Sequence, residues 1–152
     1  MQHTFVRTPR MRQLNQRQME FVLSRNHVGR VAFLRDERIE VQPIHYAFAN
    51  GAIYGRTSFG SKYLAWLDSP DIVFEVDESE GLFDWRSVIV RGTVSLLSAV
   101  GGPGAAARYG AAVAALRALD PRALTDDDPT NQRTAVFRID AVEMSGRESV
   151  AL

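Results

Sequence analysis

The chain of 152 residues contains no cysteine, only three histidines and a formal net charge of zero. The lack of cysteine excludes disulfide bonds, thiolate catalysis, cysteine-bound zinc and iron–sulfur clusters. It also fits a reducing cytoplasm, which is where we expect the protein to reside. The balanced charge argues against a general role in binding nucleic acid or a membrane surface.

Several functional motifs are also missing. No apolar run has the length of a membrane span, and no signal-peptide hydrophobic region follows the N-terminus. His3, His27 and His45 lack the spacing of a zinc motif, so no metal site is predicted. The acidic residues 126–128 lack the alternating oxygen ligands of a calcium loop and are predicted to form a solvated acidic loop. No nucleophile elbow, Walker loop or dinucleotide fingerprint follows a predicted strand.

What is present is typical of one globular domain. Apolar residues make up 45% of the chain and charged residues 24%, which is ordinary for a globular protein. A chain of this length can bury a core, so we expect a single domain over residues 1–152. The first 13 residues are locally basic, with Arg7, Arg10 and Arg12, and we expect them to form a solvated N-terminal arm.

The first half predicts a helix followed by three strands. Asn15 and Gln18 form a capping-box pattern that predicts a helix over residues 15–25. Strands follow at 28–34, 39–49 and 52–57, and Asn50-Gly51 predicts a type I′ hairpin turn. Pro43 within the second strand cannot donate to a ladder, so it indicates a sheet edge, a bulge or a nearby ligand.

The second half predicts further strands and two helices. The expected elements are a helix at 61–68, a strand at 72–77, an acidic loop at 77–84, a strand at 86–97, a break at 101–104, a helix at 105–119, a polar loop at 125–132 and a strand at 134–142, after which residues 145–147 turn the tail away. About six strands joined mainly by hairpins, with about three helices, favour an antiparallel barrel with peripheral helices.

The segment from Ile53 to Lys62 carries most of the functional information. Its strand ends in Arg56, Thr57 and Ser58, and Ser61 and Lys62 open the helix that follows. Backbone N–H groups, a helix dipole and two cations would converge there on one anion, which predicts a phosphate site. The alternative interpretation is an exposed hairpin end with ordinary polar residues.

An ordered set of segments extends this interpretation over nearly the whole chain. The segments are Val28-Gly29-Arg30-Val31-Ala32-Phe33, Val41-Gln42-Pro43-Ile44-His45-Tyr46, Ile53-Tyr54-Gly55-Arg56-Thr57-Ser58, Gly60-Ser61-Lys62, Phe74-Glu75-Val76-Asp77, Trp85-Arg86-Ser87-Val88-Ile89-Val90-Arg91-Gly92 and Ser145-Gly146-Arg147. Together they resemble the flavin-binding split-barrel family typified by pyridoxamine 5′-phosphate oxidase. The closer likeness is to its small branch that includes the nitroimidazole-resistance proteins.

The resemblance implies a mainly β fold with peripheral helices, a six-stranded antiparallel split β-barrel that forms a homodimer with FMN at the subunit interface. Matched by position, the implied cofactor-binding residues are Val41, Gln42, Pro43, Ile44 and His45 beside the isoalloxazine; Arg56, Thr57, Ser58, Ser61 and Lys62 at the phosphate; and Arg86, Ser87 and Val88 from the partner subunit.

Two departures from the family pattern bear on substrate. Gly55-Arg56-Thr57 stands where nitroimidazole-resistance proteins carry an aromatic-His-Ser/Thr stretch. The chain ends soon after Arg147 without the Arg-and-Trp extension of the pyridoxamine oxidases, so pyridoxamine phosphate is not the expected substrate.

The resulting expectation is an FMN-dependent oxidoreductase that moves electrons from a reduced donor, a nicotinamide, to a small organic acceptor. No acid–base residue stands out, and His45, Tyr54 and Trp85 are candidates to shape the substrate face. The alternatives are a non-catalytic flavin carrier or sensor, or a relative that binds deazaflavin or haem, with His27 or His45 as the axial ligand.

Overall fold

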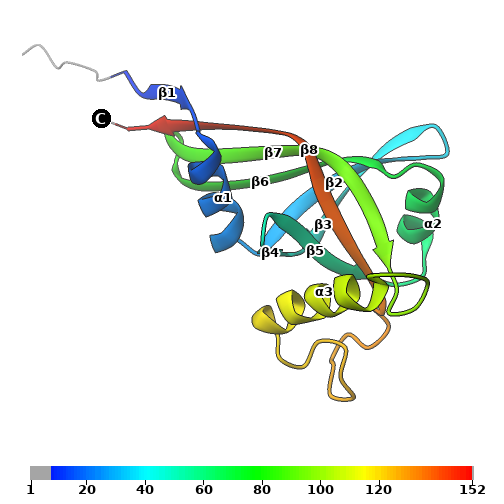
Figure 1. Cartoon of the computed structure of the whole chain (residues 1–152). Helices are drawn as coiled ribbons and strands as arrows, with labels where there is room; N and C mark the ends of the chain where they lie inside the picture. Colours follow the sequence, from blue (N-terminus) through cyan, green and yellow to red (C-terminus); the bar gives the residue numbers. More distant parts are fainter. Residues whose placement is uncertain (1–7, 152) are drawn as a thin grey trace, which may run out of the picture.

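The computed structural model describes residues 8–151 and is built on one antiparallel sheet (Figure 1). The elements in chain order are β1 (Arg10–Gln13), α1 (Gln16–Arg25), β2 (Val28–Arg35), β3 (Arg38–His45), β4 (Ala47–Ala49), β5 (Ala52–Thr57), α2 (Ser61–Asp68), β6 (Asp71–Gly81), β7 (Asp84–Leu97), α3 (Ala105–Leu119) and β8 (Ala135–Val150). The sheet has the order β3-β2-β6-β7-β8-β5-β4, and β1 pairs with β8. The predicted fold class, mainly β with peripheral helices in an antiparallel split β-barrel, is confirmed. The predicted number of six strands is too low, because the sheet of the described residues has eight.

Tyr46 divides the predicted strand 39–49 into β3 and β4, which lie at opposite ends of the sheet order. Its backbone N–H donates to the carbonyl of His27 (2.9 Å), and its buried hydroxyl donates to the carbonyl of Leu23 (2.7 Å). Burial raises the pKa of the Tyr46 hydroxyl, so it remains a donor. The chain therefore crosses at Tyr46 from one edge of the sheet to the other, and the sheet curls without closing.

Two local signals in the sequence are confirmed. The side chain of Asn15 accepts from the N–H of Gln18, and the side chain of Gln18 accepts from the N–H of Asn15, both at 2.9 Å. Asn50 and Gly51 have φ angles of 50° and 79°, as a type I′ turn requires. The edge interpretation of Pro43 also holds, because β2 is the only strand of residues 8–151 that pairs with β3.

The prediction of an acidic loop at 77–84 is wrong for most of its length, because β6 continues to Gly81 and pairs with β7. One acidic side chain of this hairpin, that of Glu78, lies among neighbouring cations. Glu78 pairs in register with Arg86 and also binds Arg25 of α1.

The predicted turn at 145–147 is also wrong, because β8 continues through it to Val150 and pairs with β7. Glycine is needed at position 146 because β8 and α1 approach each other closely there, and not because the chain turns. A Cβ at this position would lie 2.8 Å from Cγ of Met19 in α1.

Part of the predicted solvated arm is a strand. β1 pairs with the end of β8, and the buried carboxylate of Glu148 accepts from Arg12 (2.7 Å) of β1 and from Arg86 (2.9 Å) of β7. Arg7 and the rest of residues 1–7 lie outside the described part of the chain.

Trp66 anchors α2 against the sheet. Its ring lies edge-on to Phe33 at 6.0 Å and to Phe137 at 4.8 Å between centroids, and it is almost fully buried. This packing gives Trp66 a structural role in the core. It also fixes the start of α2, with Ser61 and Lys62, beside the end of β5.

We expect Gly92→Ala to lower the free energy of unfolding by about 1–2 kcal/mol. The register of β7 against β8 shifts at Gly92, and an added Cβ would lie 2.3 Å from the carbonyl oxygen of Asp140. Urea denaturation measures the loss. The matched control is Gly110→Ala in α3, where a Cβ meets nothing within 4 Å and stability should be unchanged or slightly higher. Equal stability of the two variants would contradict the packing argument.

Candidate functional site

One cavity of about 410 Å³ gathers most of the predicted cofactor-binding residues. It lies where the end of β3, the end of β5 and the start of α2 meet. It is lined by Val28, Gln42, Pro43, Ile44, His45, Arg56, Thr57, Ser58, Gly60, Ser61, Lys62 and Arg133. Its volume falls in the range of small-molecule sites.

The start of α2 lies at this cavity, and the first N–H groups of a helix have no partner within the helix. Gly60 is the N-cap residue and has no side chain with which to cap them. Ser61 and Lys62, the first two helical residues, line the cavity together with Ser58. Backbone N–H groups at such an end, with hydroxyls close by, suit a phosphate or carboxylate.

Lys62 and Arg133 bring two positive charges to the same cavity. Burial, followed by the charge of Arg133, lowers the pKa of the half-buried Lys62 ammonium. Among residues 8–151, neither side chain has a carboxylate within ion-pair distance. An anion placed between them would relieve this repulsion, so the cavity fits an anionic group.

Arg56, the third cation, is held by Asp128. Its two terminal nitrogens bind the two carboxylate oxygens of Asp128, with the Nη2–Oδ1 contact at 3.2 Å. Asp128 also accepts from the backbone N–H groups of Leu124 (2.8 Å) and Thr130 (2.9 Å). The guanidinium has five N–H donors, so the pairing fixes its orientation and leaves donors for a ligand.

The prediction of a solvated acidic loop at 126–128 is therefore wrong for Asp128, whose side chain is only 3% exposed. Asp126 and Asp127 are exposed as predicted. The ion pair with Arg56, reinforced by the Leu124 and Thr130 N–H groups, holds the pKa of Asp128 well below its usual range.

This ion pair should make stability depend on pH. The folded pKa of Asp128 lies below the unfolded value of about 3.9, so its stabilisation is complete above that pH and is lost as pH falls below it. We expect Asp128→Asn to be less stable than the natural sequence at pH 7, with the gap narrowing below about pH 4. Urea denaturation across this range, with exposed Asp126→Asn as control, measures the gap; a constant gap would contradict the assignment.

Four of the predicted residues do not line this cavity. Val41 is exposed on β3, and Val88 is fully buried in the core. Arg86 is engaged with Glu148, and the half-buried Ser87 lies beside it on β7. The expected contact of Val41 with the isoalloxazine stays a prediction, as does that of Arg86, Ser87 and Val88 with the flavin of the partner subunit.

The sequence reasoning missed Arg133 and Asp128. Both belong to the segment between α3 and β8, whose polar composition indicates only a loop. No local pattern predicts that this loop folds back over the end of β5, so no sequence signal identified either residue.

A second cavity of about 340 Å³ adjoins the first. The two share His45, Arg56 and Arg133 as lining residues. Of the candidates for the substrate face, His45 thus lines both cavities. Tyr54 is buried against α3, and neither Tyr54 nor Trp85 lines either one.

Metal-binding clusters and membrane-spanning helices are both absent from the described residues. Residues 8–151 contain no cluster of three or more His, Cys, Asp or Glu side chains arranged to hold a metal ion. No helix in the described part of the chain is long and apolar enough to cross a membrane.

Comparison with known proteins agrees with this geometry. A sequence model of the pyridoxamine 5′-phosphate oxidase family matches residues 15–148, which is most of the chain. The chain belongs to the pyridoxamine 5′-phosphate oxidase family. No curated protein matches the sequence.

Several solved structures share the fold over most of their length. A FAD-binding protein from Mesorhizobium loti is 26% identical, with a TM-score of 0.74 over 95% of this chain and 100% of its own. A putative 5-nitroimidazole antibiotic resistance protein from Bacteroides thetaiotaomicron is 14% identical, with a TM-score of 0.65 over 98% and 96% of the two chains. A FAD- and haem-binding protein from Mycobacterium smegmatis is 18% identical, with a TM-score of 0.65 over 89% and 71%.

Proposed function

We propose that this member of the family is a flavin-dependent oxidoreductase that passes electrons from a reduced donor, a nicotinamide, to a small organic acceptor. The observation that carries the proposal is the meeting of Arg56, Lys62 and Arg133 with an uncapped helix start in one cavity. The simplest cofactor that fits is FMN, whose phosphate would lie at this cradle. The similar protein from Mesorhizobium loti is FAD-binding, which supports a flavin.

The chain's own residues would bind and orient the cofactor. Lys62, Arg133 and the N–H groups of α2 would neutralise the phosphate, and Arg56 would present donors in an orientation fixed by Asp128. The edge strand β3, from Val41 to His45, would lie beside the isoalloxazine. The bound flavin supplies the exchange of hydride or electrons, and the protein supplies position and electrostatics.

A homodimer with the flavin between subunits is part of this proposal. Ile39 and Val41 of β3 and Val142 of β8 are 78%, 62% and 82% exposed, an apolar surface that a second copy would cover. Analytical ultracentrifugation of the flavin-loaded protein should show a dimer. A monomer that binds FMN with normal affinity would contradict placement at an interface.

The first test is the visible absorbance spectrum of the purified protein, with mass spectrometry of the acid-released cofactor. Flavin bands, bleached by a reduced nicotinamide and restored by an organic acceptor faster than by dioxygen alone, are expected for an enzyme. Reoxidation by dioxygen alone would indicate a flavin carrier or sensor. A released deazaflavin would keep the fold and overturn the cofactor.

Haem binding is the second candidate, because His27 and His45 both line the adjoining cavity. Imidazole is a common axial ligand of haem iron. In that case the purified protein, or protein mixed with haem, should show a Soret band that His45→Ala abolishes. A Soret band unchanged in both His27→Ala and His45→Ala would exclude this ligation.

A further inference from the structure

The side of β3, β2, β6, β7 and β8 that lies opposite the core, here called the outer face, presents exposed side chains. The helices α1 and α2 pack on the core side of these strands, where Val31, Phe74 and Val88 are fully buried. Because successive side chains of a strand alternate between its two sides, the residues between these buried ones point outward. Ile39 and Val41 of β3 belong to the outer face, which the proposed dimer would cover.

Two carboxylates lie together on the outer face with one cation beside them. Glu75 and Asp77 are alternate residues of β6, and the carboxyl of Glu75, when protonated, donates a hydrogen bond to the carboxylate of Asp77. Nη1 of Arg30 on β2 lies 3.4 Å from Oε1 of Glu75 and 3.5 Å from Oδ2 of Asp77. This carboxylate pair therefore has a net negative charge whenever both of its members are ionised.

The surroundings of the half-buried Glu75 favour its protonated form. Burial, followed by the hydrogen bond to Asp77 and the charge of Asp77, raises the pKa of Glu75 to about 7, although Arg30 acts in the opposite direction. In a free subunit at neutral pH, Glu75 therefore holds a proton for about half of the time.

The elements packed against β6 bring no second cation to the carboxylate pair. β7 places Ile89 and Ser87 directly beside it. Arg91 of β7 lies two residues beyond Ile89 and makes no ion pair with either carboxylate among residues 8–151. Arg25 of α1 binds Glu78, whose side chain lies on the other side of β6. One more positive charge can therefore reach the pair only from outside the subunit.

β8 presents a suitable cation on the same face. Arg147 is exposed and lies opposite Ser87 of β7, and no carboxylate of residues 8–151 is within ion-pair distance of it. Ser87 is expected to contact the flavin beside β3 of a second subunit. Pro43 of β3 lies in one row with Arg30 and Glu75. The expected flavin contact would therefore bring Arg147 of one copy close to the carboxylate pair of the other.

We propose that the carboxylate pair of each subunit binds Arg147 of a second copy, so that assembly of the dimer releases protons and depends on pH. The proposal rests on the dimer of the proposed function and adds the contact that controls it. A two-fold contact is self-complementary, so the same ion pair forms twice. In the dimer two guanidinium groups face each pair of carboxylates, and each Glu75 gives its proton to solvent as the subunits meet.

The direction of the pH dependence follows from the added cation. The second guanidinium lowers the pKa of Glu75 in the dimer below its value in the free subunit. The stabilisation of the dimer is therefore complete above about pH 7 and is lost as pH falls below it. Two copies of Glu75 titrate in each dimer, which doubles the response.

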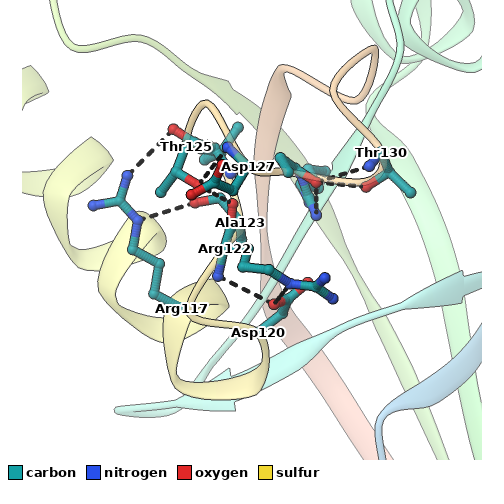
Figure 2. A network of polar contacts seen from close by, with 10 residues as sticks. Arg117, Asp120, Arg122, Ala123, Thr125, Asp127 and Thr130 are labelled. Carbon is teal, nitrogen blue, oxygen red and sulfur yellow. Dashed lines mark hydrogen bonds and ion pairs between the residues drawn. The ribbon is translucent and has the colours of Figure 1, made fainter.

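Analytical ultracentrifugation of the purified full chain over a dilution series tests the proposal. The dimer Kd should be at least about tenfold higher at pH 6 than at pH 8. Glu75→Gln, which cannot ionise, should have the same Kd at both values. The matched control is Asp127→Asn in the exposed loop after α3, where the backbone N–H of Asp127 donates to the hydroxyl of Thr125 (Figure 2). This control should keep the pH dependence of the natural sequence.

Exchange of the two charges provides a second test. Glu75→Lys and Arg147→Glu should each raise the dimer Kd at pH 8 at least about tenfold, because like charges then meet at both contacts. An equimolar mixture of the two variants should dimerise again, because opposite charges meet at both contacts of the mixed dimer. Circular dichroism shows that each variant is folded before it is mixed.

The outcomes separate the inference from the function on which it rests. A dimer whose Kd responds neither to pH nor to these variants would overturn the inference and leave the proposed function standing. A dimer that is tighter at pH 6 than at pH 8 would indicate a proton held within the interface and would also overturn it. Folded variants that stay monomeric when mixed would exclude the contact with Arg147. A natural sequence that is monomeric at both pH values would overturn the proposed dimer, and the inference with it.

Discussion

Lys62→Ala is expected to bind FMN roughly 10- to 150-fold more weakly than the natural sequence, a loss of about 1.5–3 kcal/mol. Lys62 begins α2 at the proposed cradle. Burial, followed by the charge of Arg133, already disfavours the charged form of its half-buried ammonium. A dianionic phosphate would turn this repulsion into two attractions. Fluorescence titration of flavin into the two proteins measures the difference.

Riboflavin, which lacks the phosphate, provides the matched control for this prediction. Its affinity should be the same for Lys62→Ala and for the natural sequence. Arg108→Ala, at an exposed position of α3 outside both cavities, controls for the loss of one positive charge. If Lys62→Ala weakens riboflavin and FMN equally, Lys62 acts on the ring or on the fold and not on the phosphate.

Arg56→Ala is expected to have two large effects at once. It removes a proposed phosphate ligand, and it leaves the nearly buried carboxylate of Asp128 without its cation. An unpaired buried charge is strongly destabilising, so we expect the midpoint of thermal unfolding to fall by roughly 10 °C. Differential scanning calorimetry measures this fall, and flavin titration below the new midpoint should show FMN affinity reduced at least tenfold.

The two effects can be separated by replacing both members of the ion pair. Arg56→Met combined with Asp128→Leu removes the charges and keeps similar side-chain volumes, so the midpoint should recover most of the loss. The flavin affinity should not recover, because no guanidinium returns. Recovery of FMN binding in this double variant would show that Arg56 serves the fold alone.

The sequence by itself determined the local elements and the residues that adjoin in the proposed phosphate site. The reciprocal bonds of Asn15 and Gln18 and the two positive φ angles at Asn50 and Gly51 depend on residues three positions apart or fewer. The residues from Arg56 to Lys62 are consecutive in the sequence. The end of β5 and the start of α2 therefore lie close together with little dependence on the rest of the fold. Short-range chemistry of this kind can be read from sequence.

Only the tertiary structure decided the rest. The pairing of β8 with β1 and β7 carries it past residues 145–147, and the register places Gly146 under Met19 of α1. Asp128 reaches Arg56 across 72 positions of sequence, and Arg133 reaches Lys62 from the same loop. These contacts exist because the loop between α3 and β8 packs over the end of β5, and the energy of such packing belongs to pairs of distant segments rather than to any local pattern of residues.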